Sequence, residues 1–134
     1  MDISQLNWFA VITAAVSSFI LGGLWYSPLL FGNPWMKENG FTKESLQGAN
    51  MAKIFGLSFI AALIMSVNLA MFLGPEQDTG FGAMAGFLAG FGWVAMSVGT
   101  HYLFERKSLR LFLINGVYST VALTLMGVIL GTWK

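Results

Sequence analysis

The sequence has no cysteine, a single histidine and few charged residues, and each scarcity excludes a class of function. Without cysteine there is no disulfide and no thiolate chemistry. A lone imidazole, His101, is poor support for a zinc or iron site. Charged residues form 10% of the chain and the net charge is +1, so no basic field favours nucleic acid. We expect no metal, no cofactor and no nucleic-acid partner.

Charge is missing altogether from four long stretches. No Asp, Glu, Lys or Arg lies within 3–36, 54–75, 79–104 or 111–133. A helix needs about 20 apolar residues to cross about 30 Å of hydrocarbon, and it satisfies its own backbone there. A soluble bundle would carry charges on its outer helix faces. The sequence predicts an all-α polytopic membrane protein, a single transmembrane domain over 1–134, with four antiparallel helices at about 6–26, 54–73, 81–104 and 111–133.

The basic residues indicate the orientation. With four crossings, the connections 27–53 and 105–110 share one side and carry six basic residues: Lys37, Lys43, Lys53, Arg106, Lys107 and Arg110. The other side has only Lys134. Cytoplasmic loops carry the excess of Lys and Arg, so both termini should lie outside the cytoplasm. We expect the membrane to be the bacterial cytoplasmic (inner) membrane. The start of the chain has no Lys or Arg, and its apolar run is longer than that of a cleaved signal peptide.

The first connection has clear local signals. Pro28 should end the first helix, because proline lacks an N–H and disfavours helical geometry at the residue before it. Asn33 is the expected N-cap of a short interfacial helix over 34–39. Thr42 should then cap a helical piece over 43–53, which either stops before the second span or continues into it without a break. This connection is either an elbow that sets the angle between two spans or a segment that contacts a ligand.

Small residues recur every fourth position in the spans. In the third span, Gly82, Gly86 and Gly90 form two steps of the glycine-zipper kind, which allow two helices to approach closely. Similar stripes in the first two spans are Ala10, Ala14, Ser18 and Gly22, and Ser58, Ala62, Ser66, Ala70 and Gly74. They predict close packing, either within the subunit or between subunits of a homo-oligomer.

Polar and aromatic residues gather where the first, third and fourth spans reach the basic side. His101 and Glu105 are four residues apart on one helix face and can pair. These residues outline an amphipathic pocket, or else they only bond one another and the lipid headgroups. The candidate ligand-binding residues are Trp25, Tyr26, Ser27, His101, Glu105, Arg106, Arg110, Asn115 and Tyr118.

Three segments resemble those of a known family. They are Leu24-Trp25-Tyr26-Ser27-Pro28-Leu29-Leu30-Phe31-Gly32 with Trp35-Met36, His101-Tyr102-Leu103-Phe104-Glu105-Arg106-Lys107, and Met126-Gly127-Val128-Ile129-Leu130-Gly131-Thr132-Trp133. The chain is similar in these segments, and from Trp8 to Trp133, to small four-helix membrane proteins catalogued as domain of unknown function 1761. The resemblance implies the same topology and brings no activity with it.

Two functions remain open. The first, which the sequence favours, is a non-enzymatic, homo-oligomeric structural or accessory component of the membrane. The other is a binder or carrier of a lipid or small amphipathic molecule through the pocket on the cytoplasmic side. No carboxylate lies inside a span for proton coupling, and no motif supplies a nucleophile elbow or a phosphate-binding loop. We therefore expect no enzyme.

The orientation is testable with a reporter fused after Lys134. A reporter that is active only in the cytoplasm should stay silent there, and the same reporter inserted after Lys107 should be active. An active C-terminal fusion would contradict the predicted orientation.

Overall fold

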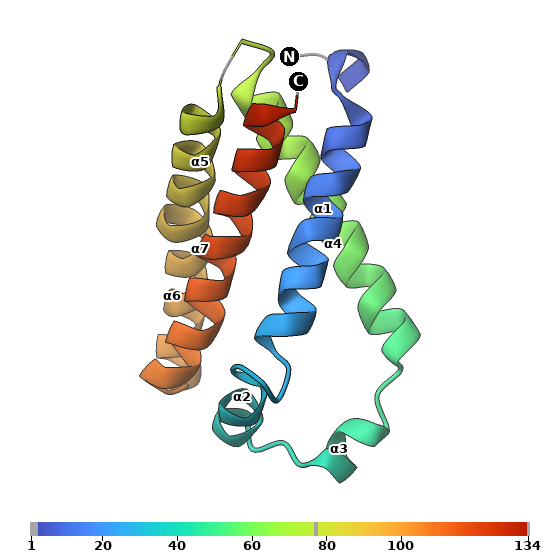
Figure 1. Ribbon diagram of the computed structural model, residues 1–134. Helices are drawn as coiled ribbons and strands as arrows, with labels where there is room; N and C mark the ends of the chain where they lie inside the picture. The colour runs from blue at the N-terminus through green and yellow to red at the C-terminus, as the bar shows by residue number, and fades with distance from the viewer. Residues whose placement is uncertain (1–2, 77, 134) are drawn as a thin grey trace.

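The computed structural model describes residues 3–76 and 78–133, and this part of the chain contains helices and no strand (Figure 1). Four helical spans are long and apolar enough to cross a membrane: Trp8–Trp25, Met51–Leu73, Thr79–Glu105 and Leu109–Thr132. Their ends lie within a few residues of the predicted ones. The predicted all-α polytopic fold is confirmed. In order, the elements are η1 (Ile3–Gln5), α1 (Trp8–Trp25), α2 (Gly32–Asn39), α3 (Lys43–Gln47), α4 (Met51–Leu73), α5 (Thr79–Phe87), η2 (Leu88–Ala95), α6 (Met96–Glu105) and α7 (Leu109–Thr132).

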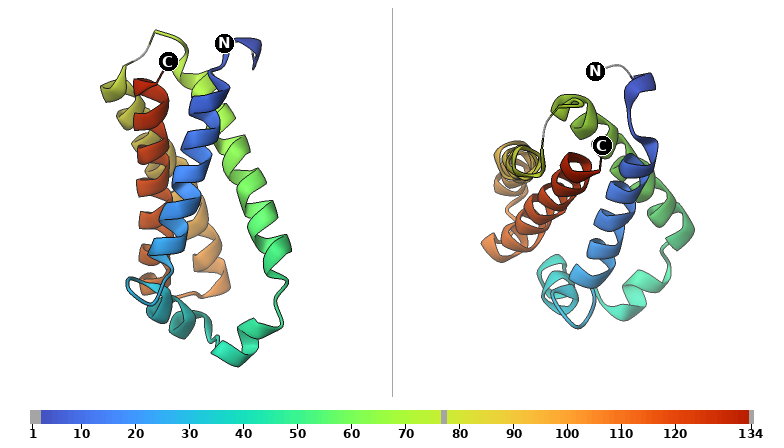
Figure 2. Two further views of the ribbon diagram at one scale, coloured as in Figure 1. Left: turned by 45° about the vertical axis from the view of Figure 1, so that its right-hand side comes forward. Right: turned by 45° about the horizontal axis from the view of Figure 1, so that its top comes forward.

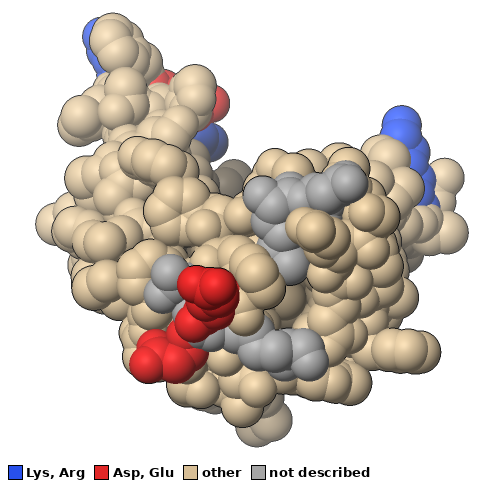
Figure 3. Space-filling view, turned by 90° about the horizontal axis from the view of Figure 1, so that it is seen from above, with Lys and Arg blue, Asp and Glu red and all other residues tan. Residues whose placement is uncertain are grey.

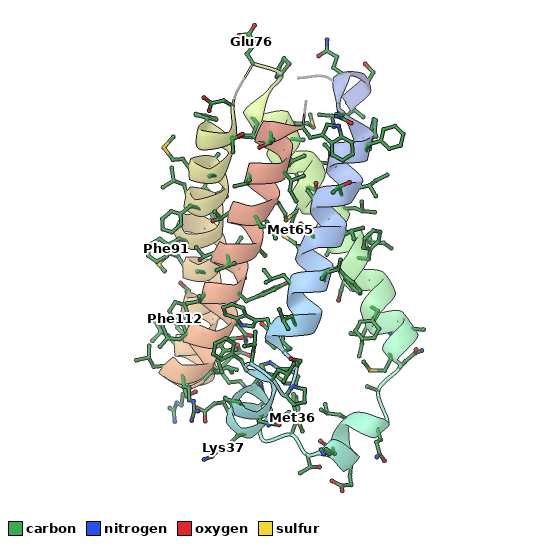
Figure 4. All side chains as sticks on the ribbon, in the orientation of Figure 1. Met36, Lys37, Met65, Glu76, Phe91 and Phe112 are labelled. Atoms are coloured by element: carbon green, nitrogen blue, oxygen red, sulfur yellow. The ribbon has the colours of Figure 1, made fainter. Side chains whose placement is uncertain are left out.

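The two ends of the bundle differ in charge. We call the end that carries α2, α3 and the α6–α7 turn the basic end, and the opposite one the termini end (Figure 1). Side chains of Met36 and Lys37 lie at the basic end, and Glu76 lies at the termini end (Figure 4). Viewed from the termini end, a group of acidic atoms lies below and to the left of the centre, whereas Lys and Arg atoms lie toward the upper-left and right margins, with further acidic atoms beside those at the upper left (Figure 3).

The connection between α1 and α4 departs from the sequence prediction in two places. α2 begins at Gly32 with Phe31 as its N-cap, so Asn33 lies inside the helix. The turn after α1 closes through the Gly32 N–H, which donates to the Ser27 carbonyl at 2.9 Å, and helical geometry therefore starts early. A side chain on Gly32 would overlap the Tyr26 and Ser27 backbone.

The second departure is a break before the second span. α3 starts as predicted after Thr42, which forms a capping box with Ser45. It ends at Gln47, and α4 begins anew behind Asn50, whose side chain accepts from the Lys53 N–H at 3.1 Å. The helix is therefore not continuous from 43 into the second span: Gly48 disfavours helix, and the Asn50 side chain caps a new helix N-terminus.

α7 lies between the helix formed by α5, η2 and α6 on one side and α1 on the other (Figures 1 and 2). A Cβ on Gly82 would overlap the Gly127 carbonyl, and one on Gly86 would overlap the Leu123 carbonyl. A Cβ on Gly90 would come within 2.8 Å of the Thr120 Cα. The glycine stripe of the third span is thus in direct backbone contact with α7 of the same chain.

The main cluster of buried core residues lies in the half of the bundle near the termini. It is built from α1, α4, α5 and α7 around residues such as Val11, Leu69, Ala85 and Met126. The buried Ser66 hydroxyl donates to the Val11 carbonyl at 2.8 Å and ties α4 to α1 there. Toward the basic end α4 diverges from the other spans (Figure 1). Its first half therefore stays exposed.

The contact between α5 and α7 predicts a steric effect at Gly86. Gly86→Ala would push a methyl group into the α7 backbone, and overpacking of this kind costs about 1–3 kcal/mol. We expect the Tm in detergent to fall by at least about 3 °C. Gly92→Ala on the same helix is the matched control, because no heavy atom lies within 4 Å of the added Cβ. Equal Tm values for the two variants would contradict the close contact.

Candidate functional site

The site at the basic end starts from the turn that terminates α1. Tyr26 is the C-cap of α1, and its N–H donates to the Gly22 carbonyl at 3.0 Å. The Phe31 N–H donates back to the Trp25 carbonyl at 2.9 Å. The Ser27 hydroxyl donates to the Leu24 carbonyl at 2.6 Å. Ser27 therefore serves the turn, and the turn fixes where the rings of Trp25 and Tyr26 point.

A short chain of hydrogen bonds joins three helices behind this turn. The Tyr26 hydroxyl donates to Asn115 Oδ1 at 2.5 Å, and Asn115 Nδ2 donates to the Tyr102 hydroxyl at 2.6 Å. We call this the Tyr26–Asn115–Tyr102 network. Burial raises the pKa of the Tyr26 phenol, and the nearby Tyr118 and Tyr102 phenols add to the shift. Tyr26 therefore keeps its proton and remains the donor to Asn115.

Aromatic rings surround the network and hold α2 against the spans. Tyr26 contacts the rings of Tyr118 and Trp35 at centroid distances of 5.3 and 5.8 Å. Trp25 contacts Phe31 at 4.7 Å, and its indole N–H donates to the Ile114 carbonyl of α7 at 3.0 Å. These polar tips are satisfied while the ring bodies pack, which is the usual arrangement for buried Tyr and Trp.

Tyr118 joins the same cluster from one helical turn further along α7. Its hydroxyl donates to the Ser18 carbonyl of α1 at 2.9 Å. A Cβ added at Gly22 would come within 3.0 Å of the Tyr118 hydroxyl, so the small residue leaves room for the ring. Four of the predicted site residues therefore meet: Trp25, Tyr26, Asn115 and Tyr118.

His101, Glu105 and Arg106 do not join them, because all three are exposed. The cause lies in η2, a π segment in the middle of the third span. Three turns of a regular α-helix take about 11 residues, which would carry the face of Gly90 on to His101. A π segment adds about one residue, so the face continues to Tyr102 instead. The expected convergence of His101 and Glu105 with Asn115 is corrected accordingly.

Residues after the π segment agree with this shift in register. Ala95 is 2% exposed, and a Cβ built on Gly116 would lie 3.5 Å from the Ala95 Cβ. A Cβ on Gly99 would meet the Phe112 ring of α7. Ala95, Gly99 and Tyr102 therefore lie on the same helix face as Gly90. The step from Gly90 to Ala95 is five residues long instead of the four of a regular α-helix. The sequence gives a weak signal for this, since small or aromatic residues occupy these positions and His101 does not share their spacing.

Arg106 has a separate structural role at the end of α6. It is the C-cap and has a left-handed backbone with φ of 59°. Within residues 3–76 and 78–133, no group of three or more His, Asp or Glu side chains is placed to hold a metal ion. The arrangement offers hydrogen-bonding phenols, an amide and aromatic faces rather than a set of ligands for a metal.

The chain matches one family model, described as a protein of unknown function (DUF1761), over residues 9–131. The chain belongs to this family. No curated protein and no solved structure matches it. The match to the DUF1761 model includes the whole cluster around Asn115 and the four spans except their end residues Trp8 and Thr132.

Two grooves flank the start of α7 in this DUF1761 chain. The first has a volume of about 400 Å³, and it lies between the α1–α2 turn and α7 with Arg110 among its lining residues. The second, of about 420 Å³, lies between α6 and α7 and includes Lys107 and Phe112. Of the nine predicted ligand-binding residues, Trp25 and Arg110 line the first groove. Tyr102, Phe31 and Trp35 take part in the cluster although they were not among the predicted site residues.

The Tyr26–Asn115–Tyr102 network predicts a stability effect. Asn115→Leu leaves two phenol hydroxyls without their partner, at about 1–3 kcal/mol for each group that stays buried and unpaired. We expect a clear fall in Tm in detergent. Adding Tyr26→Phe and Tyr102→Phe should restore part of it, because the stranded hydroxyls are then gone.

Thr120→Val is the control for this series. The Thr120 hydroxyl donates only to the Gly116 carbonyl of its own helix, at 2.9 Å, so its loss should change the Tm little. If Asn115→Leu is as stable as Thr120→Val, the network does not hold the helix ends together.

Proposed function

We propose that this DUF1761 member is a non-enzymatic integral membrane protein that binds a lipid or another small amphipathic molecule at its basic end. The first groove carries the proposal: its volume of about 400 Å³ lies within the about 300–1,000 Å³ of small-molecule sites. Its walls are apolar except for Arg110. Such a lining suits a molecule that has an apolar tail and a polar head.

The hydrogen bonding of the polar residues supports binding rather than catalysis. The Ser27 hydroxyl donates to a backbone carbonyl, which is no base that could activate it as a nucleophile. Tyr26, Asn115 and Tyr102 bond one another. None of these three residues lines the first groove, and a non-enzymatic role needs no more from them than these bonds.

The proposed orientation places the basic end in the cytoplasm of a bacterial cell and both termini outside it. The support is the distribution of Lys and Arg, six of which lie at the basic end of the molecule. With this orientation the groove opens at the level of the inner leaflet, where the headgroups of membrane lipids are within reach of Arg110.

A homo-oligomeric structural or accessory role is the second candidate. Its support is α4, whose residues 51–61 are all exposed apart from the half-buried Phe59. The glycine stripe of Gly82, Gly86 and Gly90 gives less support, because α7 of the same chain already covers it. A homo-oligomer would therefore form through α4 rather than through a glycine zipper.

Native mass spectrometry of the full chain, released from a mild detergent, tests the proposal. We expect one co-purified lipid or amphiphile per chain. Val117→Trp, which places a bulky ring in the first groove, should lose it. Leu57→Trp on the exposed part of α4 is the matched control and should keep it.

The two candidates give different spectra. A chain that carries no ligand, or a ligand that Val117→Trp retains, would contradict binding in the first groove. A ligand-free dimer or larger oligomer that Leu57→Trp dissociates would favour the structural role through α4.

A further inference from the structure

We propose that the first groove holds an anionic phospholipid, with its phosphate paired to Arg110 and an acyl chain along α7. This inference rests on the proposed binding function and names the ligand class. The groove is lined by residues from α1, the α1–α2 turn, α2 and α7, including Trp25, Leu30, Phe31, Arg110, Leu113 and Val117.

Arg110 is the one charged residue that lines the first groove. It is the second residue of α7, it is exposed, and the first turn of α7 contains no acidic side chain. Within the part of the chain that the structure describes, no carboxylate forms an ion pair with it. A guanidinium binds phosphate through two parallel hydrogen bonds, and it does so better than an ammonium. A phosphate is therefore the negatively charged group that best fits beside Arg110 in the first groove.

The apolar wall separates a phospholipid from a free phosphate. Leu30, Leu113 and Val117 line the groove, and all three are exposed although they are apolar. From Arg110 to Val117 the groove follows α7 for about 10 Å, at 1.5 Å per residue. A free phosphate would leave this wall uncovered, whereas an acyl chain attached to the phosphate would cover it. In the proposed orientation the basic end faces the cytoplasmic leaflet, whose anionic lipids give it a negative surface potential.

The wall of the first groove that Trp25 and Phe31 form is held in place by contacts within the protein. The Trp25 indole N–H donates to the Ile114 carbonyl, and the Trp25 ring packs on Phe31. A fixed wall lowers the ordering cost of binding. The second groove differs, because it lies between α6 and α7 alone and its cation is Lys107, a compact point charge. The first groove is therefore the one that we assign to the phospholipid.

Lipid titrations followed by native mass spectrometry test this assignment. The full chain in neutral detergent is titrated with phosphatidylglycerol and, separately, with phosphatidylcholine of the same acyl chains. We expect the wild-type chain to bind phosphatidylglycerol about tenfold more tightly. Arg110→Gln should remove this preference, and Arg110→Lys should retain part of it, because the charge remains while the paired hydrogen bonds are lost.

Arg106→Gln is the matched control. It removes the same charge four residues away, from a side chain that lines neither groove, and should leave the preference within about twofold of wild type. An equal loss in Arg106→Gln and Arg110→Gln would mean diffuse attraction to the basic end and would overturn the assignment. Displacement of the lipid by millimolar inorganic phosphate would overturn it too, because a free phosphate would then suffice.

Failure of the inference can be told from failure of the proposed function. If both lipids bind equally, Arg110→Gln has no effect and Val117→Trp blocks both, amphiphile binding stands and the anionic headgroup is wrong. If neither lipid binds the wild-type chain at a defined stoichiometry, the proposed function itself fails.

Discussion

The backbone contact between the third span and α7 is the constraint on which the rest of the molecule depends. Only glycine at positions 82, 86 and 90 allows the α7 carbonyls to come this close. The contact fixes α7 against one neighbour, and α1 then packs on its other side. Because α7 carries Asn115 and Tyr118, the depth and direction of these side chains at the basic end follow from glycines that lie several turns away.

The π segment Leu88–Ala95 determines which residues of the third span face α7 at the basic end. It lets the α7-facing stripe advance by five residues between Gly90 and Ala95, so that Tyr102 rather than His101 meets Asn115. The polar groups inside this end then satisfy one another. Arg110 lies at the surface beside an apolar groove, where no described carboxylate forms an ion pair with it. Because the inner polar groups bond one another, a ligand at this end would meet exposed groups such as the Arg110 guanidinium instead.

Much of the fold could be predicted because the hydrocarbon imposes a simple rule, the exclusion of charge over about 20 residues. The meeting of Trp25, Tyr26 and Asn115 followed from equal depth at one interface. The exposure of His101 could not be predicted, because the spacing of Ala95, Gly99 and Tyr102 is only a weak signal of a π segment and a regular helical period misplaces every residue after it. The early start of α2 could likewise not be predicted, since it depends on the Gly32–Ser27 hydrogen bond in the turn rather than on the capping preference of Asn33.

The register of the third span from the end of the π segment onward can be measured by disulfide cross-linking, because the chain contains no cysteine. We expect Ala95→Cys with Gly116→Cys to form a disulfide in the membrane, because the two Cβ positions lie 3.5 Å apart, within bonding geometry. Val94→Cys with Gly116→Cys, the pair that an uninterrupted α-helix from Gly90 would bring together, should stay reduced. Efficient cross-linking of the 94–116 pair with none at 95–116 would contradict the account.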